Sequence, residues 1–232
     1  MLVFGAHPDD IEFGCGGIIA GEARAGRKIH MVVCSHGEAG SFAKPEQREI
    51  EAKEAAAVFG ASIKFIALDG DSHLEMKSEH AIKLAEIIRT LRPTTVLAPT
   101  VVESQHPDHF RLGRLIRDAA RLARYGGLKE LLAHKSHSID QLLFYAVTPE
   151  GEPVHTQSLY IDISEPETMQ MWKTAMDKHT SQTSARRYVD LQITRAKLLG
   201  ARAGVEYAAA VYSEDALLYS SLGTVGKGVR QF

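Results

Sequence analysis

Apolar residues in the first 150 positions follow two alternating patterns. Short runs rich in Val, Ile, Leu and Phe, such as LVFG and TVLAP, are typical of strands buried on both faces. Longer stretches between them place apolar residues every three or four positions, as in a helix packed along one side. The pattern predicts strands at residues 2–6, 29–34, 63–68, 94–98 and 139–147, and helices at 11–26, 45–59, 79–91 and 108–124.

This alternation predicts an α/β fold. Strands separated by single helices form βαβ units, which build a parallel sheet. We therefore expect a Rossmann-like, doubly wound, mostly parallel sheet with helices on both faces and a C-terminal helical extension. We expect a single domain over residues 1–232, with a core at 1–150 and a portion at 151–232 that completes the site. In that portion, residues 159–163 fit a strand, 166–178 and 185–203 fit helices, and 207–222 fit neither clearly.

Composition and charge narrow the class of protein. The formal net charge is −2, which argues against a nucleic-acid partner. No stretch of about 18 apolar residues occurs, so no membrane span is expected. Only Cys15 and Cys34 are present and the start lacks signal-peptide character, which favours a cytoplasmic location. The densest basic stretch is expected to form a solvated helix flank. It consists of Arg111, Arg114, Arg117, Arg121 and Arg124.

Two histidine- and aspartate-rich motifs follow strands. The motif AHPDD comes directly after the first predicted strand, and HPDH comes shortly after the fourth. Ligands of open α/β sheets bind beyond the carboxyl ends of the strands, at the point where the strand order reverses. In a sheet ordered 3-2-1-4-5, strands one and four are neighbours at that point. We therefore expect the two motifs to meet in one crevice.

The residue types of these motifs suit a catalytic zinc site. Such a site usually has three protein ligands from nitrogen and oxygen, with a further position for water. His7 and Asp10 are three residues apart, so one turn can direct both side chains to one point. Either His106 or His109 would supply the third ligand, and the residues alone leave that choice open. Another divalent metal is also compatible with this ligand set.

The remaining side chains of the motifs fit the roles of a hydrolase. Asp9 is a spare carboxylate that can take a proton from the attacking water. The histidine that does not bind metal can stabilise an oxyanion or protonate a leaving amine. Asp108 can orient that histidine through a hydrogen bond.

Other interpretations explain less of the sequence. A single His-Pro-Asp triplet also forms good turns, but two copies at strand ends are hard to explain in that way. A dinucleotide-dependent oxidoreductase would need G-x-G-x-x-G at the first turn, which here reads HPDD. A two-metal phosphoesterase would need more carboxylates. A non-catalytic metal-binding module explains the ligands but not the spare Asp9. The other eight histidines are expected at the surface or in loops.

The chain resembles the PIG-L/LmbE family of zinc deacetylases, most of all the bacterial BshB type, which acts on N-acetylglucosaminyl-malate in bacillithiol synthesis. The resemblance is carried by LVFGAHPDDIEFGCGG, Gly37-Glu38, Arg48 with Glu51, and VLAPT with HPDH, and more weakly by YIDIS and GVEYAAAVY. It implies a hydrolase that removes the N-acetyl group from an N-acetylglucosamine-type conjugate with one Zn²⁺ per chain. It also implies a homo-oligomer, a trimer or hexamer.

The resemblance also implies individual residue roles. Asp9 would be the general base, and His106, with Asp108 behind it, would stabilise the oxyanion or protonate the amine. Arg48 and Tyr188 would contact the substrate. The implied metal ligands are His7, Asp10 and His109. The sequence departs from the family where relatives often have an acidic residue in a Tyr-Ala-Glu segment, which here reads Tyr207-Ala208-Ala209-Ala210.

Overall fold

A computed structural model describes residues 1–184, 186–226 and 228. The described residues form one seven-stranded sheet in the order β3-β2-β1-β4-β5-β7-β6. The first five strands are parallel, whereas β7 is antiparallel to both β5 and β6. The strands are β1 (Leu2–Gly5), β2 (His30–Val33), β3 (Ser62–Phe65), β4 (Thr95–Pro99), β5 (Gln141–Tyr145), β6 (Ser158–Asp162) and β7 (Ala208–Tyr212).

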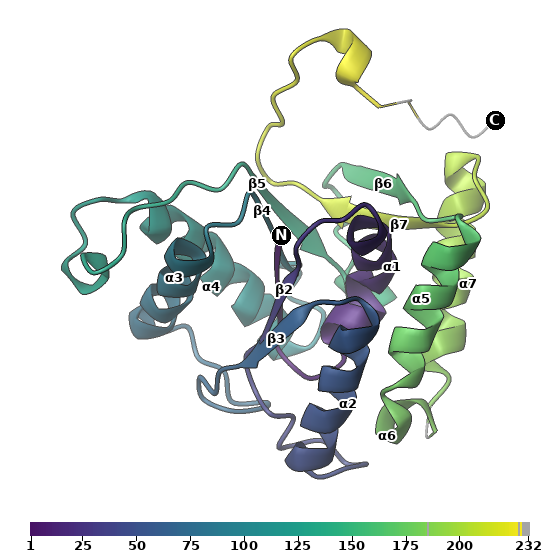
Figure 1. Ribbon diagram of the computed structural model, residues 1–232, viewed down its shortest axis with the longest axis horizontal. Helices are drawn as coiled ribbons and strands as arrows, with labels where there is room; N and C mark the ends of the chain where they lie inside the picture. Colours follow the sequence, from purple (N-terminus) through teal and green to yellow (C-terminus); the bar gives the residue numbers. More distant parts are fainter. Residues whose placement is uncertain (185, 227, 229–232) are drawn as a thin grey trace.

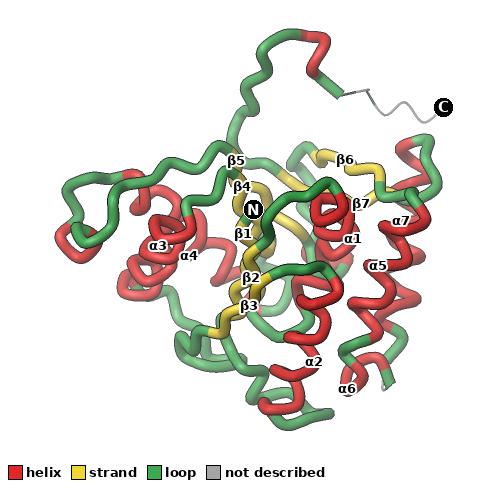
Figure 2. Tube along the Cα trace, in the orientation of Figure 1, coloured by secondary structure: helices red, strands yellow, loops and turns green. Residues whose placement is uncertain are grey.

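Helices cover both faces of this sheet, which confirms the predicted fold class (Figure 1). In Figure 2, α3 and α4 lie on one side of the strands, and α1, α2, α5 and α7 lie on the other. None of the described helices combines the length and apolar character needed to cross a bilayer. The helices are α1 (Asp10–Arg24), α2 (Pro45–Val58), α3 (Ser78–Leu91), α4 (Pro107–Arg124), α5 (Pro166–Asp177), α6 (Thr180–Thr183) and α7 (Tyr188–Ala203).

Two apolar layers hold the helices against the sheet. Alternate strand residues point to opposite faces, so neighbours in β1 enter different layers. Phe4 packs on the α3–α4 side with Leu112 and Ile116, whereas Val3 packs on the α1 side with Ile19. All five side chains are buried. Burial of this kind contributes roughly 1.5–3 kcal/mol per large apolar side chain, which fixes the strand ends relative to the helix starts.

Glycines bring α1 close to its neighbours. A Cβ on Gly14 would overlap the Tyr145 ring, and one on Gly16 would lie 2.6 Å from Trp172. The Trp172 indole N–H in turn donates to the Glu12 carbonyl at 2.7 Å. These glycines therefore serve close packing of α1, as their position inside the helix suggests.

The C-terminal portion contributes strands as well as helices. Three residues of the Tyr207-Ala210 segment belong to β7 itself. This strand pairs with β6 along its whole length, from Ser158 opposite Tyr212 to Asp162 opposite Ala208. The helix expected at residues 185–203 is observed from Tyr188 to Ala203, and residue 185 lies outside the described residues. After β7 the chain extends away from the body (Figure 1).

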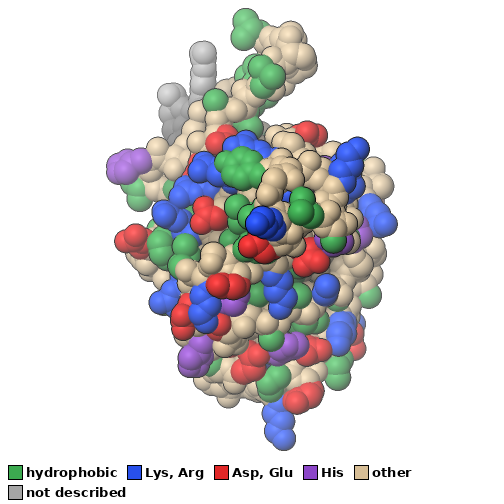
Figure 3. Space-filling view, turned by 90° about the vertical axis from the view of Figure 1, so that its left-hand side faces the viewer, with side chains coloured by type: hydrophobic (Ala, Val, Ile, Leu, Met, Phe, Trp, Pro, Cys, Tyr) green, Lys and Arg blue, Asp and Glu red, His purple; other side chains and the backbone are tan. Residues whose placement is uncertain are grey.

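Acidic and basic side chains are interspersed on the α3–α4 face (Figure 3). On this side of the fold, Arg117 of α4 pairs with Glu214 at 2.5 Å, and Arg111 lies 3.7 Å from Asp108. Two arginines of the α4 flank therefore have acidic partners.

Candidate active site

A cavity of about 320 Å³ lies at the carboxyl ends of β1 and β4. It contains both predicted motifs, because β1 and β4 pair side by side with Leu2 opposite Val96 and Val3 opposite Leu97. Every site residue predicted from the sequence lines this cavity except Asp108, which lies buried behind it. The lining residues named in the prediction are His7, Asp9, Asp10, Arg48, His106, His109 and Tyr188.

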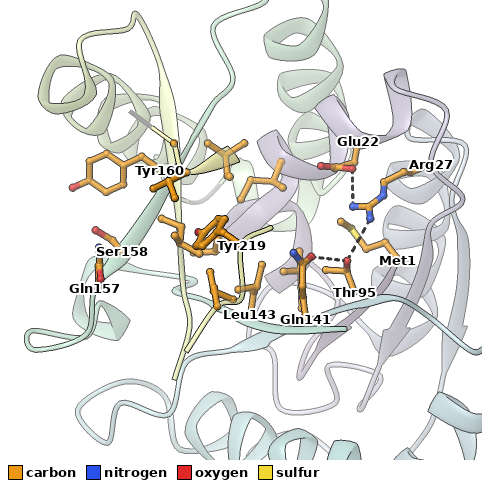
Figure 4. Close-up of a pocket in the computed structure, with 18 of the residues that line it drawn as sticks. Met1, Glu22, Arg27, Thr95, Gln141, Leu143, Gln157, Ser158, Tyr160 and Tyr219 are labelled. Atoms are coloured by element: carbon orange, nitrogen blue, oxygen red, sulfur yellow. Dashed lines mark hydrogen bonds and ion pairs between the residues drawn. The ribbon is translucent and has the colours of Figure 1, made fainter. Parts of the chain in front are cut away.

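A larger cavity, of about 840 Å³, lies elsewhere, between α1, the sheet and the segment after β7 (Figure 4). Four of its polar side chains are paired with one another. Arg27 donates to Glu22 at 3.0 Å and to Thr95 at 3.4 Å, and Thr95 donates to Gln141 at 3.0 Å. The described residues that line this cavity include no cluster of histidines and carboxylates, so the smaller cavity is the candidate active site.

Side-chain atoms of three residues, His7, Asp10 and His109, converge at the junction of the motifs. His109 Nε2 lies 3.1 Å from Asp10 Oδ1 and 3.3 Å from His7 Nδ1, and His7 Nδ1 lies 3.5 Å from Asp10 Oδ2. Two ligands bound about 2.0–2.1 Å from a tetrahedral ion would be about 3.3 Å apart. The donor set and its spacing therefore fit a divalent metal ion. His106 also offers a nitrogen within 4.8 Å of those of His7 and His109.

Backbone hydrogen bonds fix the Asp10 carboxylate. The N–H groups of Ala6 and His7 donate to Asp10 Oδ2 at 2.8 and 2.9 Å, which leaves Oδ1 facing His109. Burial opposes ionisation of this group, but the neighbouring imidazoles of His109 and His7 hold the pKa of Asp10 well below its usual range. The carboxylate is therefore ionised, and its Oδ1 is held facing His109, as a metal ligand requires.

The other nitrogen of His7 faces two carboxylates. Nε2 lies 3.2 Å from Asp71 Oδ1 and 3.3 Å from Asp108 Oδ2. Burial opposes protonation, but Asp10, Asp108 and Asp71 raise the pKa of His7 well above its ordinary value. A proton on Nε2 leaves Nδ1 directed at His109, the arrangement typical of a metal-binding histidine held by a carboxylate.

The expected contact between the Asp108 carboxylate and His106 is therefore wrong. Asp108 Oδ2 accepts a hydrogen bond from the Ser72 N–H at 2.7 Å and lies beside His7 instead. The reason is local geometry, since His106 caps the N-terminus of α4 and Asp108 lies in its first turn. The backbone N–H of Asp108, not its carboxylate, donates to His106 Nδ1 at 3.2 Å.

This capping hydrogen bond defines the tautomer of His106. Because Nδ1 accepts a backbone N–H, neutral His106 has its proton on Nε2. Burial and the neighbouring His7 and His109 lower the pKa of His106, which favours this neutral form. His106 is thus set up as a hydrogen-bond donor toward the cavity that it lines.

Asp9 has an unusual backbone conformation. Its φ of 122° and ψ of −26° lie in a region that residues with a Cβ rarely adopt. Such conformations cluster at functional sites, where the surrounding structure holds them. Burial raises the pKa of Asp9 to about 6, against the opposing charge of Arg48. That value is close to the range in which a general base works best.

Arg48 is buried beneath the first motif. Its Nη2 donates to the Pro8 carbonyl at 2.9 Å and to Asp9 Oδ2 at 3.3 Å, and its Nη1 donates to the Gly37 carbonyl at 3.2 Å. Its Nη1 also lies 3.7 Å from Asp71. Arg48 therefore stabilises the turn that carries Asp9. It also lines the cavity, where the resemblance to known deacetylases predicts a contact with the substrate.

Several residues of the site were not predicted from the sequence. Asp71 follows the carboxyl end of β3, and this position after a strand was the one feature of the sequence that could have indicated a site residue. Gln182 and Arg186 precede α7 and line the cavity, but nothing in the sequence distinguishes them from other polar residues near a helix end. His179 lies in the short connection between α5 and α6, which agrees with the expectation of a surface or loop position, but its side chain is not exposed. It is buried beside α1, with Nε2 3.4 Å from Glu12 Oε2, and its ring packs 5.9 Å from that of Phe13.

The PIG-L family, described as GlcNAc-PI de-N-acetylase, matches residues 2–120, just over half of the chain and the part that holds both motifs. The chain belongs to the PIG-L family. The fold agrees with this family: the crystal structure of the conserved protein TT1542 from Thermus thermophilus superposes with a TM-score of 0.84 at 31% identity, covering 94% of this chain and 95% of that one.

Two relatives in this comparison have different activities. The diacetylchitobiose deacetylase of Thermococcus kodakarensis is 28% identical over 195 residues, which cover 78% of this chain and 69% of that enzyme. The 4-oxalmesaconate hydratase of Pseudomonas putida is 31% identical over 140 residues, covering 55% of this chain and 54% of the hydratase. The chain thus spans about half the length of that hydratase. Membership of the PIG-L family fixes the fold but does not separate these two reactions.

Proposed function

We propose that this protein is a metal-dependent de-N-acetylase that hydrolyses the acetamide of an N-acetylglucosamine-type conjugate. The observation that carries the proposal is the convergence of His7 Nδ1, Asp10 Oδ1 and His109 Nε2 beside a partly buried carboxylate, Asp9, and a donor histidine, His106. The proposed metal ligands are the first three residues, and Zn²⁺ is the proposed ion. A bound divalent ion would polarise the acetyl carbonyl and lower the pKa of water.

The side chains of the chain supply the proton transfers. Asp9 accepts a proton from the water that attacks the acetyl carbon, and Arg48, 3.3 Å away, holds its carboxylate in place. His106 donates its Nε2 proton in a hydrogen bond to the carbonyl oxygen as negative charge develops there. The proton held by Asp9 then passes to the amide nitrogen as the C–N bond breaks. The products are acetate and a free amine, which account for all atoms of the amide and water.

Acetate release tests this function. We would assay N-acetylglucosamine, diacetylchitobiose and N-acetylglucosaminyl-malate with purified, metal-loaded protein, and measure metal content alongside. At least one conjugate should release acetate together with a primary amine. The same protein would be given 4-oxalmesaconate, because a hydratase relative exists. Hydration of that substrate without any acetate release would replace the proposal.

Variants then assign the roles. Asp9→Asn should retain the metal and lose roughly 10²–10⁴-fold in kcat, because it removes the base. His106→Gln should retain the metal and lose roughly 10²–10³-fold, since it removes an oxyanion donor. His155→Gln changes an exposed histidine in a loop and serves as the matched control. Loss of the metal in His106→Gln would show that His106 is a ligand instead.

A further inference from the structure

Glu51 is a buried carboxylate of α2 that attaches this helix to α6. Ser181 Oγ donates to Glu51 Oε2 at 2.6 Å, and the Ser181 N–H donates to Oε1 at 3.0 Å. The Thr180 hydroxyl also donates to Oε1, at 2.8 Å. A fourth donor is Gln47, one turn earlier on α2, at 3.0 Å. These hydrogen bonds hold the two helices side by side (Figure 1).

The hydroxyl of Ser181 has a fixed direction in this arrangement. Burial opposes ionisation of Glu51, but the hydrogen bonds from Ser181, Thr180 and Gln47 hold its pKa below the ordinary value. An ionised carboxylate only accepts hydrogen bonds, so the hydroxyl proton of Ser181 points to Glu51. The oxygen of Ser181 is then left as an acceptor for its other neighbour.

That neighbour is the side-chain amide of Gln182, whose Nε2 lies 3.1 Å from Ser181 Oγ. Only the NH₂ end of an amide can donate, so the direction of the Ser181 hydroxyl requires Nε2 to face Ser181 and Oε1 to face away. Gln182 is partly buried and lines the active-site cavity. Its carbonyl oxygen is therefore the end of the amide that is available to a molecule in the cavity.

We propose that Gln182 accepts a hydrogen bond from a hydroxyl of the substrate sugar, and that Glu51 is a positioning residue that fixes the direction of this amide through Ser181. This inference rests on the proposed function and adds a preference for a hydrogen-bond donor. Neither Glu51 nor Ser181 takes part in proton transfer. In this arrangement α2 supports two sides of the cavity, because Arg48, about one turn before Glu51, holds the turn that carries Asp9.

Fluorinated sugars test the direction of the hydrogen bond. The probes are the methyl glycoside of N-acetylglucosamine and its 3-, 4- and 6-deoxyfluoro analogues, since fluorine can replace a hydroxyl but cannot donate. At one of these positions, the wild type should prefer the hydroxyl by about fivefold or more in kcat/KM, because the fluoro analogue leaves an amide oxygen unpaired. The effect should lie mainly in KM. A wild type that treats all four glycosides alike would overturn the proposal.

Gln182→Met should reduce this hydroxyl-to-fluorine ratio to near one, because the variant side chain has no strong acceptor. Gln170→Met is the matched control. Gln170 makes an equivalent hydrogen bond, from its Nε2 to the Thr174 hydroxyl at 3.2 Å, but it lies on the exposed side of α5. The control should keep the wild-type ratio. An unchanged ratio in Gln182→Met would refute the contact with the substrate.

Two variants test the positioning role of Glu51. In Glu51→Gln the new NH₂ group can donate to Ser181, whose proton can then point to Gln182 and allow its amide to turn over. The ratio should therefore fall toward one. Ser181→Ala should have the same effect, whereas Ser181→Thr keeps the hydroxyl and should keep the ratio. A purely structural role would lower kcat/KM for hydroxyl and fluoro probes by the same factor, and that result would overturn the positioning role.

Calorimetry separates this inference from the proposed function. If no glycoside releases acetate, the deacetylase proposal fails, but the dissociation constants of the same four probes still test Gln182. Tighter binding of the hydroxyl probe that is lost in Gln182→Met and retained in Gln170→Met would support the inference. Equal affinities for the hydroxyl and fluoro probes in the wild type would refute it.

Discussion

The backbone of Asp9 makes a measurable prediction about stability. At φ 122° a Cβ is strained, and such positions cost about 1–3 kcal/mol. Asp9→Ala and Asp9→Gly both remove the carboxylate and its contact with Arg48, so their difference isolates the Cβ. Glycine loses about 0.5–1 kcal/mol more backbone entropy than alanine on folding. The glycine variant should therefore be the more stable of the two by about 1 kcal/mol, which reverses the usual order.

Urea unfolding of the metal-stripped variants would measure this difference at matched m-values. In a thermal scan it corresponds to about 2–4 °C for a chain of this size. Ala23→Gly is the control, because Ala23 lies within α1, where glycine should destabilise. Both Asp9 variants should lack hydrolysis. An alanine variant as stable as the glycine variant would show that residue 9 is unstrained, and strain could then have no part in its function.

Three further predictions follow from contacts described above. Asp108→Asn should weaken metal binding by about 10–100-fold, because it alters the carboxylate that orients His7; competition with a chelator measures this, and unchanged affinity would contradict it. Gly14→Ala should destabilise the protein by about 1–3 kcal/mol through its clash with an aromatic ring, whereas Gly21→Ala, in the same helix with its nearest contact at 3.9 Å, should not; chemical denaturation compares them. Burial opposes ionisation of Asp69, but hydrogen bonds from a lysine and a histidine hold its pKa below the ordinary value, so its contribution is present above the unfolded-state pKa of about 3.9 and is lost as pH falls through the folded value. Asp69→Asn should thus be less stable than wild type at pH 7, with the gap closing in acid; a gap independent of pH would exclude this account.

The meeting of the two motifs could be predicted because it depends on strand order. Five buried apolar runs separated by helical periods define a parallel sheet, and a parallel sheet places strand ends at one edge. The side chains of His7, Asp10 and His109 therefore meet as expected, with His109 Nε2 3.3 Å from His7 Nδ1 and 3.1 Å from Asp10 Oδ1. Spacing along the chain carries no information about side-chain direction within the α4 cap, so the orientation of the Asp108 carboxylate could not be predicted.

The C-terminal portion was less predictable for a related reason. Residues 207–212 read YAAAVY, and alanine favours helices while the flanking residues favour strands. Pairing with β6 and β5 decides the outcome, and those partners lie far away in the sequence. The burial of His179 beside Glu12 likewise depends on how α5 and α6 pack on α1, which no local pattern records.

The pairing of β1 with β4 has a consequence for folding. His109 lies about 100 positions from His7 and Asp10, and it approaches them only after these two strands have aligned. An unfolded or partly folded chain would bind the ion far more weakly. Metal binding would therefore stabilise the folded state relative to the unfolded state. Chelation should then lower the melting temperature of the protein, although all of the proposed ligands are side chains.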